Sequence, residues 1–466
     1  MMKIQRNKFL GQNPTRMIIL GFLIVIFMGT ILLNLPIASR SGESIGFLDA
    51  LFMATSAVCV TGLVVVNTLS HWSVFGKVVI ICLIQIGGLG FMTFITLGLM
   101  LARKKITLKE RILIKESYNQ NSLQGMVKYV RRILVGTVFI ELVGAIILSI
   151  RFSFDFGVQK GVIYGVFHSI SAFCNAGFDI IGQESITPYV GDTVINLTIM
   201  GLIIIGGLGF TVWIDTVKIL KMKMENGISW RNAIRRLSLH GKIVYTTTAV
   251  LIFGSALFFL LCEFENTETM AQLPMGSKVL ASFMQAVTAR TAGFNTIDQG
   301  SMTDASKIMT VLLMFIGGSP GGTAGGIKTV TMSVLVIAVI SVIKGSRTTH
   351  CYERRIPFET LQKSLAVFFI SLSAVIGITM LLTFTESGMT GAHEFMDLLF
   401  EVTSALGTVG VTTGVTPHLS VAGKMIIALA MFMGRIGPIS IVIALSRKQS
   451  QDIDHIQYPE DRVIVG

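Results

Sequence analysis

The sequence predicts an all-α integral membrane protein with four tandem repeats around a pseudo-fourfold pore. Each repeat would hold a membrane span, a re-entrant pore helix and a second span, which gives eight transmembrane helices. Composition supports this class, because the 466 residues are 52% hydrophobic, only 14% charged and have a mean hydropathy of +0.72. Soluble chains carry about 25% charged residues. Apolar runs near the roughly 20 residues that a crossing helix needs recur along the chain, and one glycine-containing stretch recurs four times.

The repeats follow one order along the chain. They are predicted over residues 17–102, 132–217, 243–343 and 365–446. Their first spans are 17–37, 132–151, 243–263 and 365–385, and their second spans are 77–102, 193–217, 305–343 and 421–446. Between the two spans lie segments too short to cross, at 46–57, 161–173, 277–289 and 392–405. Their length suits half-membrane helices that are surrounded by protein.

Positive charge sets the predicted orientation. Most of the 38 Lys and Arg residues lie in five segments, which are 1–16, 103–131, 218–242, 344–364 and 447–466. The positive-inside rule places these segments and both termini in the cytoplasm of a cell-membrane protein. The net charge of +12 therefore indicates orientation and contact with lipid, not nucleic-acid binding. The run 17–37 is expected to be a span, because it has no cleavage site suited to a signal peptide and many spans follow it.

The four glycine stretches predict an ion pathway. Gly62, Gly177, Gly293 and Gly410 stand in similar sequence contexts at intervals of 115, 116 and 117 residues. Thr408-Val409-Gly410 matches the start of the potassium-channel filter, in which backbone carbonyls replace the water shell of the ion. Glycines that only let helices pack closely would not recur at this spacing. The predicted ion-coordinating residues are Val60, Thr61, Gly62, Asn175, Ala176, Gly177, Thr291, Ala292, Gly293, Thr408, Val409 and Gly410.

A short helix that ends at each filter stretch would favour a cation. The carboxyl end of a helix carries a partial negative charge of about half an electron. Four such ends that meet on one axis would stabilise a cation below the filter. The filter tripeptides contain no acidic residue, so selectivity is expected to come from carbonyl oxygens. Arg290, three residues before Gly293, is expected to brace the filter from behind.

The second span of the third repeat predicts a gate. Residues 305–343 exceed the length of one crossing and contain a glycine-rich run that a helix cannot continue, because glycine costs about 1 kcal/mol and proline about 3 kcal/mol per position. An ordinary external loop is the alternative, while a phosphate-binding loop is excluded because Ile327 precedes Lys328. The predicted gating residues in this loop, 317–326, are Gly317, Gly318, Ser319, Pro320, Gly321, Gly322, Thr323, Ala324, Gly325 and Gly326.

Arg435 is predicted to complete the gate. A cation inside a span costs roughly 2.5–3.5 kcal/mol even on a mild scale, so Arg435 is expected to face the water-filled path and form a barrier. A structural salt bridge to Glu401 or Glu141 is the alternative. Glu141 is expected to be a packed, hydrogen-bonded group, and His168 is assigned no role.

With these features together, the sequence resembles the Trk/Ktr/HKT superfamily of potassium transporters, and more narrowly the membrane subunit of bacterial Ktr systems. The tail 458–466 is similar to the characteristic carboxyl end of that family. The resemblance implies potassium uptake, often linked to sodium, by a homodimer. It also implies an RCK-type cytosolic ring of regulatory subunits that would bind ATP/ADP or NAD(H), so this chain itself would need no cofactor. Serine at the first filter position accompanies sodium transport in the plant branch, and Gly62 in its place favours potassium.

Two other functions stay open on the residues alone. One is a carrier that alternates access around a site at the membrane midplane. The other is a multispan membrane enzyme, which would need His, Cys or acidic residues converging at one depth. The sequence shows no such cluster, and the five cysteines have no metal or redox spacing. We therefore expect a protein that is not an enzyme.

Overall fold

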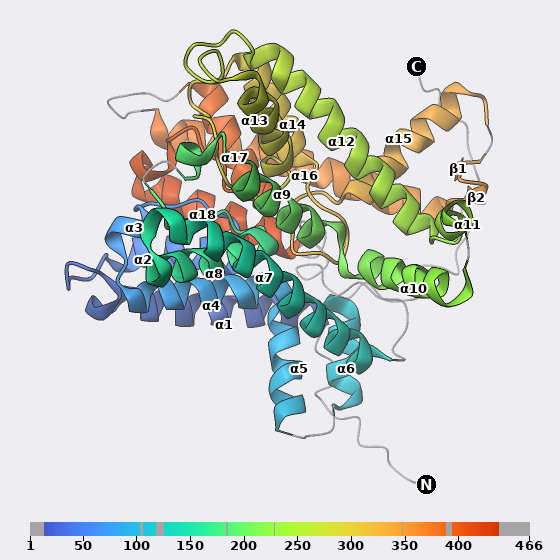
Figure 1. The fold of residues 1–466 in the computed structure, drawn as a ribbon, viewed down its shortest axis with the longest axis horizontal. Coiled ribbons are helices and arrows are strands. Elements are labelled where there is room, and N and C mark those ends of the chain that lie inside the picture. Colours follow the sequence, from blue (N-terminus) through green and yellow to red (C-terminus); the bar gives the residue numbers. More distant parts are fainter. Residues whose placement is uncertain are drawn as a thin grey trace.

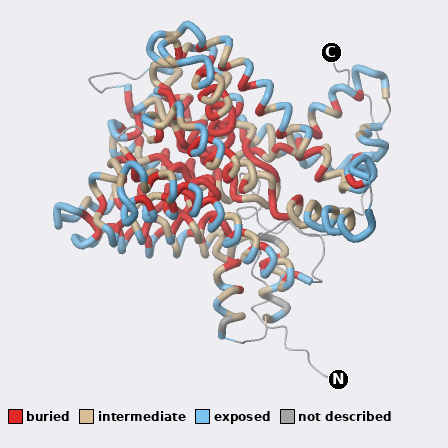
Figure 2. The backbone as a smooth tube through the Cα atoms, in the orientation of Figure 1, coloured by how far each residue is buried: buried red, intermediate tan, exposed pale blue. Residues whose placement is uncertain are grey.

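The computed structural model describes residues 14–102, 106–117, 125–182, 185–227, 229–346, 348–387 and 394–437. It is mostly helical, and the buried residues gather where the four repeats meet (Figures 1 and 2). The predicted tail 447–466, most of the arm 1–16 and the end of the last span, 438–446, lie outside the described residues.

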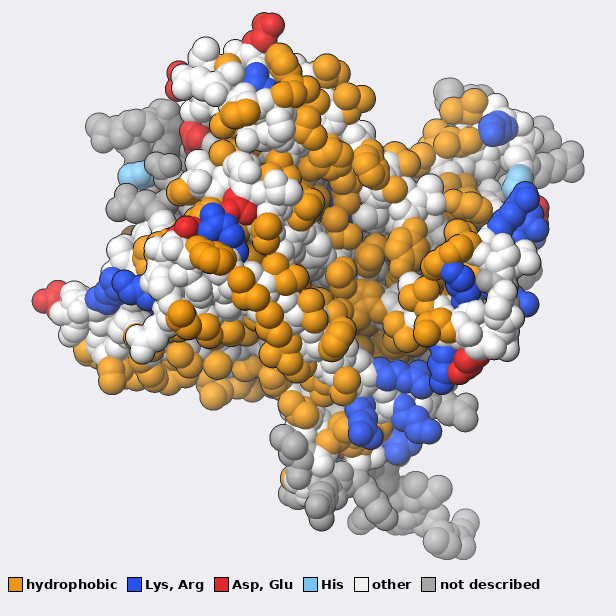
Figure 3. All heavy atoms as spheres, in the orientation of Figure 1, with side chains coloured by type: hydrophobic (Ala, Val, Ile, Leu, Met, Phe, Trp, Pro, Cys, Tyr) orange, Lys and Arg blue, Asp and Glu red, His pale blue; other side chains and the backbone are white. Residues whose placement is uncertain are grey.

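Each repeat contains a long first helix and a shorter pore helix. The first helices are α1 (Pro14–Asn34), α7 (Met126–Phe156), α12 (Leu239–Glu263) and α16 (Phe358–Glu386). The pore helices are α2 (Phe47–Cys59), α8 (Val158–Cys174), α13 (Met275–Thr288) and α17 (Phe395–Gly407). In the described part of the chain, the four first helices are long and apolar enough to cross a membrane. Much of the surface that they form is hydrophobic (Figure 3).

The second span is a broken helix in the first two repeats. The sequence predicts continuous spans over 77–102 and 193–217, but α4 (Val74–Leu89) meets α5 (Phe91–Leu101) at 95°, and α9 (Thr193–Leu208) meets α10 (Phe210–Asn226) at 100°. Gly90 and Gly209 lie at the two breaks with φ of 79° and 92°. Glycine adopts such angles at little steric cost, which explains why both helices end there despite continuous hydrophobicity.

The remaining second spans also differ between repeats. In the third repeat α14 (Asp304–Phe315) and α15 (Thr329–Ile343) are separated by an irregular segment, as the sequence predicts. In the fourth, α18 (Val421–Ile436) ends close to the last described residue. The smaller elements are η2 (Pro36–Ala38), α3 (Thr68–His71), α6 (Leu108–Ser117), η3 (Thr187–Tyr189), α11 (Trp230–Arg235), β1 (His350–Cys351), β2 (Arg354–Arg355) and η4 (Thr416–His418).

Two ion pairs join the fourth repeat to its neighbours. Lys307 of the third repeat lies 3.3 Å from Asp397 on α17, and Lys424 of the fourth lies 2.8 Å from Asp49 on α2. The two pairs are equivalent, because each lysine stands 14 residues after its filter glycine and each aspartate stands 13 residues before one. The same contact thus links repeat three to four and repeat four to one.

Candidate ion pathway

Three pore helices end in the same backbone arrangement. Val60, Asn175 and Thr408 directly follow α2, α8 and α17 and take the left-handed conformation, with φ of 56°, 59° and 50°. The N–H of the next residue then donates to the carbonyl five positions back, over 2.8 Å in each repeat. This pairing satisfies carbonyls at the end of the helix. It also turns the chain sharply into the glycine stretch.

The third repeat reaches the same conformation by a different route. Helix α13 ends at Thr288, and Ala289 is still in the right-handed helical region. Thr291 then adopts φ of 73°, and the N–H of Ala292 donates to the carbonyl of Thr288 over 3.0 Å. Thr291 therefore matches Val60 and its counterparts, although the helix ends earlier.

The four glycines meet in one ring. Their φ angles are 97°, 66°, 83° and 87° for Gly62, Gly177, Gly293 and Gly410. A methyl group added to Gly62 would lie 2.5 Å from the carbonyl oxygen of repeat two, on Ala176. The same addition to each later glycine would meet the backbone of the following repeat, and at Gly410 it would overlap that of repeat one. The structure therefore brings the four glycine stretches together, with each glycine packed against the backbone of the next repeat.

Serine side chains support this ring from behind. Ser56 and Ser404 stand six residues before their filter glycines, and each hydroxyl accepts the glycine N–H over 3.1 Å. Ser171 holds the same position in repeat two, where its hydroxyl donates to the carbonyl of Phe178 over 2.7 Å. Val287 replaces the serine in repeat three, so this support is specific to three of the repeats.

Two further supporting side chains are not predicted by the sequence analysis. His168 and Glu401 are fully buried, and each stands nine residues before a filter glycine. The Nε2 of His168 accepts the N–H of Ile180 over 3.4 Å. The Glu401 carboxylate accepts the hydroxyls of Thr412 and Thr416, the latter over 2.8 Å. Both side chains thus hold the segment that leaves the filter. Aligning the repeats on their filter glycines puts His168 and Glu401 at the same repeat position, which is the sequence signal that could have found them.

We expect that Glu401→Gln lowers the preference for potassium over sodium about tenfold. A hydrogen bond to a charged group contributes about 1.5–3 kcal/mol. In glutamine an NH2 group replaces one carboxylate oxygen, so a donor would face the hydroxyl donors of Thr412 and Thr416. Competition between the two ions in uptake assays measures this change. Thr416→Ser keeps the hydroxyl and is the matched control. Equal selectivity in the wild type and Glu401→Gln would contradict this role for Glu401.

The loop 317–326 packs against the broken second span of repeat two. The N–H groups of Ser319 and Thr323 donate to the carbonyls of Gly207 and Gly206 over 2.9 and 3.2 Å, while Phe210 donates to Gly321 over 2.9 Å. The backbone of the loop is therefore satisfied by the broken second span of repeat two. Irregular backbone survives at membrane depth only where such partners exist.

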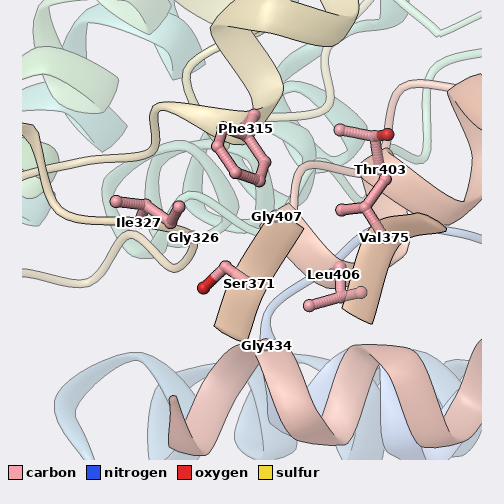
Figure 4. Close-up of a pocket in the computed structure, with 9 residues that line it drawn as sticks. All are labelled: Phe315, Gly326, Ile327, Ser371, Val375, Thr403, Leu406, Gly407 and Gly434. Carbon is pink, nitrogen blue, oxygen red and sulfur yellow. The ribbon is translucent and has the colours of Figure 1, made fainter. Parts of the chain in front are cut away.

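The loop also lies directly against two filter stretches. The hydroxyl of Thr323 donates to the carbonyl of Phe173, at the end of α8, over 3.1 Å. Gly325 packs against Thr408 so closely that a methyl group there would overlap the threonine hydroxyl. On the other side of the loop, a small cavity adjoins Gly326 and is lined mainly by apolar residues of α14, α16 and α17 (Figure 4). The loop therefore packs against the ends of α8 and α17, next to the glycine stretches of repeats two and four.

Arg435 connects this loop to the rest of the pore. Its guanidinium donates to the carbonyl of Thr323 in the loop and to the carbonyls of Gly87 and Gly88 at the end of α4, the last over 3.1 Å. One side chain of repeat four thus joins repeats three and one.

Neither alternative salt bridge to Arg435 is present among the described residues. The Glu401 carboxylate is bound to threonines, and Glu141 accepts the side-chain N–H of Gln85 over 3.0 Å, which agrees with a packed, hydrogen-bonded group. Arg435 is therefore held by carbonyl oxygens instead of acids.

The chemistry of the site is that of neutral backbone oxygens. Within the described residues no group of three or more His, Cys, Asp or Glu side chains could hold a metal ion. A ring of carbonyls can replace the hydration shell of a monovalent cation without a charged side chain.

Comparison with known proteins agrees with this arrangement. The chain is 41% identical to the Ktr system potassium uptake protein B of Bacillus subtilis (strain 168) over 468 residues, which covers 100% of both chains. It is 39% identical to the potassium/sodium uptake protein NtpJ of Enterococcus hirae, with 97% of each covered. The crystal structure of the potassium transporter TrkH from Vibrio parahaemolyticus matches with a TM-score of 0.73 at 16% identity, over 95% of this chain and 87% of that one.

The family described as TrkH, cation transport protein, matches residues 6–455. This match covers nearly the whole chain, including all four filter stretches. The chain belongs to the TrkH family of cation transport proteins.

Proposed function

We propose that this protein takes up potassium across the cell membrane through the ring of filter carbonyls. The observation that carries the proposal is the closed ring of Gly62, Gly177, Gly293 and Gly410, each packed against the next repeat. The membrane potential would drive the ion inward, at about 2.3 kcal/mol per charge per 100 mV. The printed names of the relatives, which are potassium and potassium/sodium uptake proteins, support the choice of ion.

The twelve filter residues would coordinate the ion through their main-chain oxygens. The left-handed residues that follow the pore helices begin each stretch, and the positive φ of each glycine ends it. Support from Ser56 and Ser404 would fix the width of the ring, because their hydroxyls hold the N–H groups of Gly62 and Gly410. A ring of fixed width would favour a larger, more easily dehydrated ion over sodium.

The loop 317–326 and Arg435 would form the gate. The loop would lie beneath the filter, and the bonds of Arg435 to the Thr323 carbonyl and to α4 support this role. Movement of the loop would then require these hydrogen bonds to break. An alternating-access carrier is a second candidate, since a loop that closes the path on one side is also what a carrier needs. Rates of flux far above those of carriers would separate the two.

The protein would act as a homodimer with both termini in the cytoplasm, together with a separate regulatory ring that binds ATP/ADP or NAD(H). Three relatives are named as parts of a Ktr system, which supports a membrane subunit with partners. The basic segments 103–131 and 218–242 are the candidate docking surfaces. This chain itself would bind no nucleotide.

Growth of a bacterium that lacks its own potassium uptake systems tests the function. We expect the wild-type chain to restore growth at low potassium, more strongly when a regulatory subunit is expressed with it. Gly410→Val should not restore growth, because its side chain would overlap the backbone of repeat one. Absence of rescue by a folded, membrane-inserted wild-type chain, with and without the subunit, would overturn the proposal.

A further inference from the structure

Arg290 is a buried cation without a partner in the described part of the chain. Only 8% of the residue is exposed, and its buried Nε has no hydrogen-bond acceptor. Arg435, by contrast, donates to three carbonyls, and the partly exposed Arg151 pairs with the carboxylates of Asp155 and Asp192. The expected brace from Arg290 to the filter is therefore not made by a hydrogen bond of its side chain.

A small cavity adjoins Arg290. It lies where α9, α12, α13 and the start of the loop 317–326 meet, and it is lined by Ile203, Ile204, Gly207, Leu208, Thr248, Val287, Arg290 and Gly318. Thr248 on α12 is 7% exposed, and its buried hydroxyl also has no partner. Two unsatisfied donors thus line the same cavity, whose other side chains are aliphatic.

This arrangement is costly for the protein alone. A buried charge that is neither paired nor hydrogen-bonded is strongly unfavourable. Arg290 also directly precedes Thr291, the first filter residue of repeat three, so an uncompensated guanidinium would repel a cation at the filter. A ligand that only accepts hydrogen bonds and carries negative charge would relieve both problems.

We propose that this cavity binds one small monovalent anion, chloride under physiological conditions, between the Arg290 guanidinium and the Thr248 hydroxyl. A halide suits the aliphatic lining, because it needs few directed hydrogen bonds. A water molecule is the competing occupant, because the guanidinium and the hydroxyl offer the two polar partners that it needs, but water leaves the charge of Arg290 uncompensated. Binding of the halide can be measured without transport, so this inference does not depend on the proposed potassium uptake.

Thermal unfolding of the purified full-length chain tests the site. Potassium gluconate is replaced stepwise by potassium chloride or bromide at constant potassium concentration and ionic strength. Because a ligand that binds only the folded state raises stability with its concentration, Tm should rise and then saturate for the wild type. The rise should vanish in Arg290→Gln and shrink in Thr248→Val. Arg151→Gln, which removes a paired arginine, is the control and should keep the full halide response.

A direct measurement keeps the test independent of the variants. Crystals of the wild type grown with bromide should show an anomalous peak beside Arg290 and Thr248. A Tm that is unaffected by halide, an equal rise in Arg290→Gln, or a cavity that holds only water in bromide would each overturn the anion site. None of these outcomes would change growth rescue by the wild-type chain, so failure here is distinct from failure of the uptake function.

Discussion

Replacing Gly62 with serine is expected to lower the preference for potassium over sodium by about tenfold or more. Gly62 has φ of 97°, which side chains rarely adopt, and a Cβ there would lie 2.5 Å from the carbonyl oxygen of Ala176 and 3.2 Å from the Cα of Gly177. A strained residue of this kind costs about 1–3 kcal/mol. The strain can be relieved only if the ring opens between repeats one and two, and a wider ring no longer replaces the potassium hydration shell closely.

Gly46→Ser provides the matched control for this experiment. Gly46 precedes the same pore helix and has φ of 94°, but a Cβ there would meet nothing within 4 Å. Serine at position 46 therefore introduces similar backbone strain without contacting the ring of filter glycines. Uptake of potassium and sodium in competition, at matched protein levels, gives the selectivity of each variant. Unchanged selectivity in Gly62→Ser, or an equal loss in Gly46→Ser, would argue against a filter at this ring.

Gly293→Ser extends the same test to the third repeat. Its Cβ would lie 2.7 Å from the carbonyl oxygen of Val409 and 2.8 Å from the Cα of Gly177. If all four repeats share one ring, this change should also lower selectivity, although α13 ends two residues earlier, relative to its glycine, than its counterparts. Loss of selectivity at Gly62 but not at Gly293 would mean that the repeats contribute unequally.

The ring could be predicted from the sequence because its signal is repeated. A single Thr-Val-Gly run carries little information, but glycines at intervals of 115, 116 and 117 residues have no simple packing explanation. The short helices before the glycine stretches could be predicted in the same way, from the length of their segments. Both features depend on local sequence and on spacing, which are readable without coordinates.

The bends and the buried supports could not be predicted, for two physical reasons. Hydrophobicity continues without interruption through Gly90 and Gly209, so nothing in the apolar pattern marks the change of direction. The partners of Arg435, Glu401 and His168 are backbone groups distant in sequence or threonine hydroxyls, which leave no charge pattern to match. The alternative of a salt bridge from Arg435 to Glu401 or Glu141 is therefore wrong, because backbone carbonyls bind the guanidinium.

Replacing Arg435 with alanine is expected to raise the rate of potassium flux about tenfold. Hydrogen bonds to a charged group contribute about 1.5–3 kcal/mol each, and Arg435 makes them to Thr323 of the loop and to Gly87 and Gly88 of α4. A change of 1.4 kcal/mol in the balance between closed and open loop is about a factor of ten in population. Deletion of several residues within 318–325 should act in the same direction, because it removes the loop itself.

Two variants separate release of the loop from loss of charge. Arg435→Lys keeps the charge but lacks the planar, branched donor that reaches two backbones at once, so flux should rise nearly as much as in alanine. Thr323→Val keeps the carbonyl that Arg435 binds and removes only the hydroxyl bond to Phe173, so its flux should rise less. Purified protein in vesicles with a potassium gradient gives these rates. If flux stays level or falls in folded Arg435→Ala, then the contact between Arg435 and the loop does not hold the pathway closed. If Arg435→Lys has the potassium flux of the wild type, the positive charge alone sets the barrier. The three carbonyl contacts of Arg435 then only position its side chain.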